Sequence, residues 1–138
     1  MTSPRQMDWL ATPERTRKGN RYAEFRLQCA VASTLRQFIN PKWRAVHLPF
    51  GEHRTPATAG RLKRMGVEPG WPDWLLVGPG KVCFLELKRG NGKPSKEQAE
   101  IATHVMMCGC GYGIAWTYDN AIGMLKDWGV IPPTVRVQ

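Results

Sequence analysis

Two carboxylates and a lysine that could act together in acid–base or metal chemistry are found in one short stretch of the sequence: Asp73, Glu86 and Lys88. They border or lie within two short apolar runs, 73–77 and 82–88, which a Gly-Pro-Gly-Lys segment separates. Glycine and proline between two strand-like runs predict a β-hairpin. The two carboxylates then belong to opposite strands, at the open end of that hairpin.

A symmetric turn would bring these carboxylates together. Val77 would pair with Val82, and counting outward places Asp73 opposite Glu86, with Cβ atoms roughly 4.5–5.5 Å apart. Side chains alternate with a period of two, so Lys88 would share their face. The hairpin is otherwise apolar on both faces, which predicts an interior position in a sheet, where isolated charges are costly. A slip of one residue would turn Glu86 and Lys88 to the face opposite Asp73.

Divalent metal binding explains such a cluster. Magnesium prefers a few carboxylate oxygens together with several waters. Asp73 and Glu86 supply two carboxylates, and the backbone carbonyl of Leu87 could add a third oxygen. A bound metal can polarise a phosphoryl oxygen and activate water, and Lys88 could orient that water or stabilise charge on phosphate. From the residues alone, an ordinary carboxylate–lysine ion pair at a sheet edge remains the alternative.

The remaining pattern predicts the elements that would position these residues. The apolar spacing predicts an amphipathic helix over 21–39, with a stripe of Tyr22, Phe25, Cys29, Ala32, Leu35, Phe38 and Ile39. Further predicted elements are a strand at 44–49, a helix from a Ser95–Gln98 capping box to about 107, a strand at 112–118 and a helix capped by Asp119 at 120–128. The expected fold is a mixed α/β sheet flanked by helices. We expect one domain over 21–130, preceded by an arm at 1–20 and followed by a tail at 131–138.

Charge favours a polyanionic partner. Twenty Lys and Arg residues against eleven Asp and Glu residues give a net charge of +9, which is typical of nucleic-acid binding, although charge can also serve solubility alone. The basic connection 53–69 is typical of a functional or mobile loop that contacts phosphate, and also of a short solvated helix, and the two interpretations are not exclusive. Candidate phosphate contacts are Arg54, Arg61, Lys63, Arg64, Arg89 and Lys93. No apolar run is long enough to span a bilayer, and the N-terminus lacks the apolar core of a secretory signal.

Four features together resemble the PD-(D/E)XK nuclease signature, and specifically its VRR-Nuc branch. They are Glu24 on the first predicted helix, Gly70-Trp71-Pro72-Asp73, Glu86-Leu87-Lys88, and Ser95-x-x-Gln98 after a glycine-rich turn. The resemblance covers about residues 21–125 and implies a restriction-endonuclease-like αβββαβ core. It also implies that Asp73, Glu86 and the Leu87 carbonyl hold Mg²⁺ or Mn²⁺ and that Lys88 assists the nucleophilic water. Glu24 would complete the acidic cluster as a possible further metal ligand, and Gln98 would help position the site.

The resemblance implies a metal-dependent endonuclease that hydrolyses DNA. Small stand-alone VRR-Nuc proteins of phages and bacteria are similar to junction-cleaving homodimers. We therefore expect cleavage of branched DNA such as four-way (Holliday) junctions, a possible homodimer, no membrane partner, and a cytoplasmic location in a bacterium or phage-infected cell. The alternatives are a less selective DNase or nickase in phage DNA processing, and a catalytically silent nucleic-acid-binding module.

Overall fold

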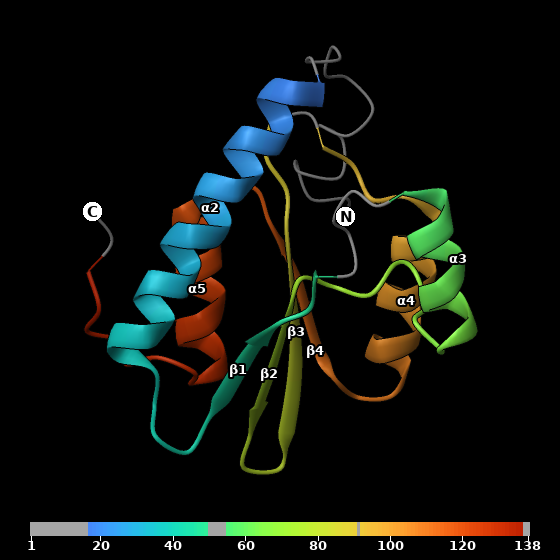
Figure 1. Ribbon diagram of the computed structural model, residues 1–138. Helices are drawn as coiled ribbons and strands as arrows, with labels where there is room; N and C mark the ends of the chain where they lie inside the picture. The colour runs from blue at the N-terminus through green and yellow to red at the C-terminus, as the bar shows by residue number, and fades with distance from the viewer. Residues whose placement is uncertain (1–16, 50–54, 91, 137–138) are drawn as a thin grey trace, which may run out of the picture. The chain divides into compact units, whose positions relative to one another are not determined.

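A computed structural model describes residues 17–49, 55–90 and 92–136 (Figure 1). The order of elements is α2 (Arg17–Phe38), β1 (Arg44–His47), α3 (Pro56–Arg64), β2 (Trp74–Gly78), β3 (Lys81–Leu87), α4 (Lys96–Met107), β4 (Gly111–Ala115) and α5 (Tyr118–Trp128). The strands form one sheet in the order β1-β2-β3-β4. The predicted mixed α/β fold with an αβββαβ core is confirmed, with α3 as an additional helix between β1 and β2.

The chain divides into two compact units. The helical unit comprises the segments up to Pro41, Leu87–Lys93 and from Ile114 onward, and the sheet unit comprises Lys42–Glu86 and Pro94–Gly113. The predicted domain boundaries stay a prediction, and most of the predicted arm at 1–20 lies outside the described residues. Within the described part of the chain, no helix combines the length and the apolar character that crossing a membrane requires.

The central hairpin has the register that its turn predicts. Strands β2 and β3 are antiparallel, and Val77 pairs with Val82. Gly80 has a φ of 65° and follows Pro79, as a type II turn requires. Because β2 and β3 occupy the two middle positions of the sheet, the predicted interior position of the hairpin is also confirmed.

The two faces of this hairpin differ in burial. One face is buried except next to the turn and carries Trp74, Leu76, Cys83, Leu85 and Leu87. On the other face Phe84 and Glu86 are buried, whereas Val77 near the turn is 42% exposed. Burial on this second face therefore increases toward the open end of the hairpin, where the carboxylates lie.

The outer strands complete a mixed sheet. Strand β1 runs antiparallel to β2, with Arg44 opposite Val77 and His47 opposite Trp74. Strand β4 runs in the same direction as β3. Its first residue, Gly111, hydrogen-bonds the Cys83 thiol early in β3, and its last residue, Ala115, accepts a 2.8 Å hydrogen bond from the Lys88 N–H just after β3.

In the helical unit, α2 packs beside α5 (Figure 1). The predicted apolar stripe of α2 is wrong: Tyr22 and Phe25 are 65% and 63% exposed. Cys29 and Phe38 are also exposed. Of the predicted stripe, Leu35 is buried, and it shares the buried face with Leu27, Val31 and Thr34, which also recur at helical spacing. The Thr34 hydroxyl lies 2.6 Å from the Tyr118 hydroxyl of α5, so this face is matched to α5.

Helix α5 begins at Tyr118, and its N-cap is Thr117, whose hydroxyl accepts from the Asn120 N–H at 3.1 Å. The predicted cap at Asp119 is therefore wrong by two residues, because a threonine with extended backbone is available earlier. The buried residues of α5 are Ala121, Ile122 and Leu125.

Helix α3 occupies most of the basic connection. Thr55 is its N-cap, accepting from the Thr58 N–H at 3.2 Å, and Pro56 lies in its first turn. The short solvated helix predicted for this connection is present at 56–64, and a phosphate-binding role of the connection stays a prediction. None of its residues is buried, so α3 contributes little to the core.

Candidate active site

Asp73 and Glu86 lie at the open end of the hairpin. The paired residues of β2 and β3 extend outward to Trp74 and Leu85, and the next residues outward are Asp73 before β2 and Glu86 on β3. Side-chain alternation places both carboxylates on one face. Glu86 is 4% exposed and Asp73 is half-buried. The predicted pairing of the two carboxylates thus agrees with the register, and their catalytic role stays a prediction.

The backbone of Asp73 is fixed by the strand next to it. Its carbonyl oxygen accepts a 2.6 Å hydrogen bond from the Leu48 N–H and lies 2.9 Å from Nδ1 of His47. For that contact to be a hydrogen bond, Nδ1 must carry the proton. The centroids of the His47 and Trp74 rings also lie 5.6 Å apart. Sequence reasoning missed His47, because its place beside Asp73 depends on the pairing of β1 with β2.

The loop before Asp73 packs against both the hairpin and α4. Gly70 has a φ of 96°, and a Cβ there would lie 2.7 Å from the backbone of Glu97. The ring centroids of Trp71 and of Phe84 on β3 lie 5.7 Å apart. The indole N–H of Trp71 donates to the Glu68 carboxylate at 2.9 Å. These contacts fix the loop that carries the aspartate.

Gln98 begins α4 as a capping residue. The Gln98 N–H donates to the Ser95 hydroxyl at 3.1 Å, and the Gln98 side-chain oxygen accepts from the Ser95 N–H at 2.9 Å. This capping box is the one predicted from the sequence. The capping box uses the side-chain oxygen of Gln98. The amide NH₂ group is therefore the part of Gln98 suited to the site-positioning role that the family resemblance implies.

Tyr112 of β4 lies within electrostatic reach of both carboxylates. Burial raises the pKa of its phenol, and the charges of Glu86 and Asp73 raise it further. A charged phenolate beside two carboxylates is disfavoured, so the phenol stays protonated and can donate a hydrogen bond. Nothing in the local sequence marks Tyr112, because its position depends on the pairing of β4 with β3.

The other predicted site residues lie in the helical unit. Lys88 follows β3 and is half-buried, as is Glu24 on α2. Leu87, whose carbonyl is a predicted metal ligand, is buried. The structure describes these residues within their own unit, and their roles stay predictions.

The donor set in the sheet unit suits a hard cation with few protein ligands. Over the described residues, no group of three or more His, Cys, Asp or Glu side chains could hold a metal ion. The candidate ligands are therefore a pair of carboxylates supplemented by backbone oxygen. Magnesium binds through one or two carboxylates and keeps several waters, so the residues fit Mg²⁺ or Mn²⁺ better than a metal that requires a full protein cage.

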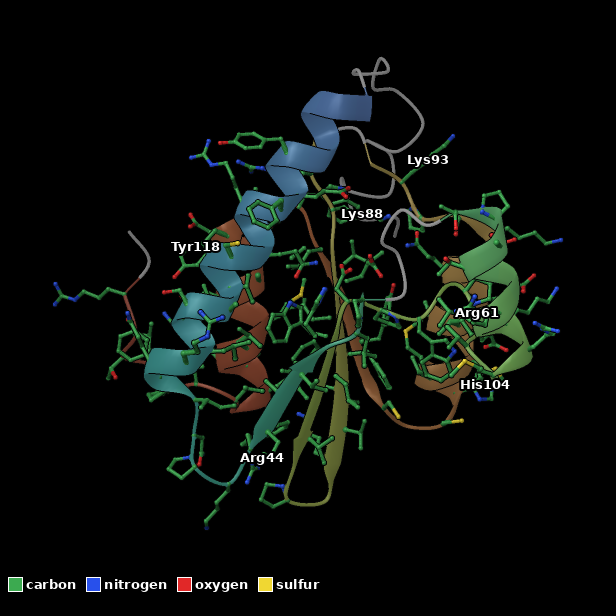
Figure 2. All side chains as sticks on the ribbon, viewed as in Figure 1. Arg44, Arg61, Lys88, Lys93, His104 and Tyr118 are labelled. Atoms are coloured by element: carbon green, nitrogen blue, oxygen red, sulfur yellow. The ribbon has the colours of Figure 1, made fainter. Side chains whose placement is uncertain are left out.

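The predicted phosphate contacts are exposed. Arg61, Lys63 and Arg64 lie in the last turn of α3, and Figure 2 labels Arg61 on this helix. Arg89 and Lys93 are exposed in the turn after β3. Arg54 lies outside the described residues.

Two solved structures share this architecture. One, described as a VRR_NUC domain protein, superposes with a TM-score of 0.59 and 21% identity, covering 76% of this chain and 86% of its own. Another, described as a VRR_NUC domain, has a TM-score of 0.51 and 17% identity, covering 76% of this chain and 96% of its own. The chain has the VRR_NUC fold. The resemblance carried by the sequence motifs is thus confirmed at the level of the fold.

No known family model matches the sequence, and no functionally curated protein is matched by it. The VRR_NUC likeness is therefore structural. The identities of 17% and 21% show the fold, and the chemistry must be argued from the site.

Proposed function

We propose that this VRR_NUC-fold protein is a metal-dependent endodeoxyribonuclease that hydrolyses phosphodiester bonds in branched DNA such as four-way junctions. One observation supports the proposal: Glu86 is a carboxylate only 4% exposed and lies one position beyond the Trp74–Leu85 pair, so that continuing the register would bring it across from Asp73. Carboxylate oxygens are the ligands that Mg²⁺ and Mn²⁺ prefer in proteins. A divalent cation at this end of the hairpin would be bound by both carboxylates.

In this proposal Asp73, Glu86 and the Leu87 carbonyl hold Mg²⁺ or Mn²⁺, and Glu24 is a further ligand. When bound, the cation polarises a phosphoryl oxygen and lowers the pKa of a bound water. The His47 and Leu48 contacts with the Asp73 carbonyl keep that residue in place, which favours a preorganised site.

The remaining residues act on substrate. The ammonium group of Lys88 orients the attacking water and stabilises negative charge that develops on phosphate. Gln98 positions the site through its amide NH₂ group. Arg61, Lys63, Arg64, Arg89 and Lys93 bind the DNA backbone, which the net charge of +9 supports.

Cleavage assays test this proposal. Wild-type protein should nick a four-way junction with Mg²⁺ or Mn²⁺ and not in EDTA. Asp73→Asn, Glu86→Gln and Lys88→Ala should each lower the rate by about 10³-fold or more, in line with the loss of a group that stabilises the transition state. Glu100→Gln, an isosteric change at an exposed position on α4, is the matched control and should retain activity. Full activity in a folded Asp73→Asn or Glu86→Gln variant would exclude the assigned site.

The preference for branched DNA rests on the resemblance to small VRR-Nuc proteins, and a comparison of substrates tests it separately. Junctions should be cleaved faster than flaps and linear duplex. Equal rates on all three would favour the less selective DNase or nickase. A homodimer would present two sites to two DNA strands, and sedimentation of the protein with and without junction DNA would detect it.

A further inference from the structure

The turn after β3 folds back and is held by an indole from the end of β4. The Lys88 N–H donates to the Ala115 carbonyl at 2.8 Å, and the Gly92 N–H donates to the Arg89 carbonyl at 3.2 Å. The indole N–H of Trp116 then donates to the Gly92 carbonyl at 3.0 Å. Trp116 therefore fixes the returning end of the turn, and the backbone bond to Ala115 fixes its start. All of these residues belong to the helical unit.

The folded turn brings Gly92 against the Lys88 side chain. A Cβ built at Gly92 would lie 3.3 Å from Cδ and 3.6 Å from Cβ of Lys88. The aliphatic stem of Lys88 thus lies alongside the Gly92 backbone. A Cβ at Gly92 would also lie 3.3 Å from the Arg89 carbonyl oxygen, so a side chain there would require its neighbours to shift by a few tenths of an ångström. In agreement, Lys88 is half-buried, whereas Arg89 and Lys93 in the same turn are exposed. Figure 2 shows Lys88 and Lys93 near opposite ends of this turn.

This contact matters because a lysine side chain is long and flexible. A lysine on an open surface samples many rotamers, and ordering it carries a large entropic cost. A catalytic lysine must nevertheless present its ammonium group within a fraction of an ångström of its productive position. Packing the stem against a fixed backbone segment supplies this order before substrate binds.

We propose that Trp116 is a positioning residue for Lys88, acting through the Gly92 carbonyl. Its indole N–H holds the Gly92 backbone in place, and the Gly92 backbone confines the Lys88 stem. This inference rests on the proposed function for the role of Lys88 in cleavage, but the confinement itself does not require it.

NMR relaxation measures the confinement without any activity. In protein labelled with ¹³C-lysine, the Lys88 Cδ signal is assigned by its loss in Lys88→Ala. Its order parameter should exceed that of Lys93 in the wild type. Trp116→Phe keeps the ring but removes the N–H donor, and it should lower the Lys88 value to the level of Lys93. Trp128→Phe is the matched control, since Trp128 ends α5, about 15 Å of helix beyond its start, and it should leave Lys88 unchanged.

Gly92→Ala tests the same contact from the other side. The new methyl group meets Lys88 Cδ at 3.3 Å, so the lysine stem must move by a few tenths of an ångström while the Trp116 bond remains. We expect Trp116→Phe and Gly92→Ala each to lower kcat for junction cleavage roughly tenfold, because small misplacements of catalytic groups are costly. KM and Mn²⁺ affinity should stay at wild-type values. Neither change should lower cleavage further in a Lys88→Ala background, since it acts through that side chain.

The outcomes separate this inference from the proposed function. If Lys88 Cδ is as mobile as Lys93 in the wild type, or if Trp116→Phe leaves its order unchanged, the confinement by Trp116 is wrong. If Lys88 loosens while kcat is unchanged in an active enzyme, the positioning role is wrong. If Lys88 loosens as expected and the wild type cleaves no DNA, the confinement stands and the proposed nuclease function fails.

Discussion

The open end of the hairpin and helix α3 both belong to the sheet unit, and both carry charges that the proposed function needs, but they are built in opposite ways. Glu86 is 4% exposed, and Asp73 is held through its carbonyl by the His47 side chain and the Leu48 N–H. Helix α3 has no buried residue and carries its basic side chains in its last turn.

This difference follows from what each region has to do. A pair of carboxylates that holds a metal must keep a fixed separation, so it requires a rigid and buried setting. Phosphate contacts depend mainly on the number of charges near the DNA backbone, so they tolerate exposed, flexible side chains. Substitutions in the two regions should therefore affect different properties of the protein.

The largest effect on stability is expected next to the carboxylates. Gly70→Ala introduces a Cβ 2.7 Å from the Glu97 backbone at a φ of 96°. Strain at positive φ and overpacking should together lower the free energy of unfolding by about 3 kcal/mol. Urea denaturation followed by circular dichroism measures this change.

Gly60→Ala in α3 is the matched control for this change. A Cβ at Gly60 has no atom within 4 Å, and alanine is favoured over glycine in a helix. The free energy of unfolding should therefore rise by about 0.5–1 kcal/mol. Equal effects of the two substitutions would contradict the contrast between a packed and an open region.

A smaller effect, on DNA affinity alone, is expected from α3. Replacing Arg61, Lys63 and Arg64 together by alanine should weaken junction binding and reduce the slope of log K against log salt by up to about 3, since each phosphate contact contributes about 0.9. The rate at saturating DNA should be unchanged. Arg44→Ala, at the end of β1 that pairs with Val77 rather than near Asp73, is the control. An unaltered salt slope in the triple variant would remove α3 from the DNA interface.

The smallest effect is a pH dependence that reports on the carboxylates through Tyr112. Because the pKa of Tyr112 is raised in the folded state, its stabilising contribution is present below the unfolded value of about 10. It is lost as the unfolded phenol ionises above that pH. The unfolding free energy should fall less steeply above pH 10 in Tyr112→Phe than in the wild type. Tyr22→Phe, which removes an exposed phenol, should not have this effect; if it did, the assignment to Tyr112 would be wrong.

What could be predicted from the sequence was set by local rules. The turn at Pro79 and Gly80 fixes the register of the hairpin, so the pairing of Asp73 with Glu86 follows from counting along two adjacent strands. The Ser95–Gln98 capping box is likewise local. The start of helix α3 is also encoded locally, because a threonine followed by a proline, here Thr55 and Pro56, is a helix-start signal.

What could not be predicted depended on distant pairings. In α2, both the Tyr22–Phe25 stripe and the Leu27–Val31 stripe have helical spacing, and the position of α5 decides which one is buried. His47 and Tyr112 reach the carboxylates only because β1 and β4 flank the hairpin. The confinement of Lys88 depends in the same way on Trp116, which follows β4 and lies 28 positions further along the sequence.

Mn²⁺ titration by calorimetry tests most directly the claim that the open end of the hairpin is a divalent-metal site. Wild-type protein and Glu100→Gln should bind Mn²⁺ with the same affinity, whereas Glu86→Gln and Asp73→Asn should lose most of that binding while remaining folded. Folded wild-type protein that binds no Mn²⁺, with or without junction DNA, would contradict the account and favour a catalytically silent nucleic-acid-binding module.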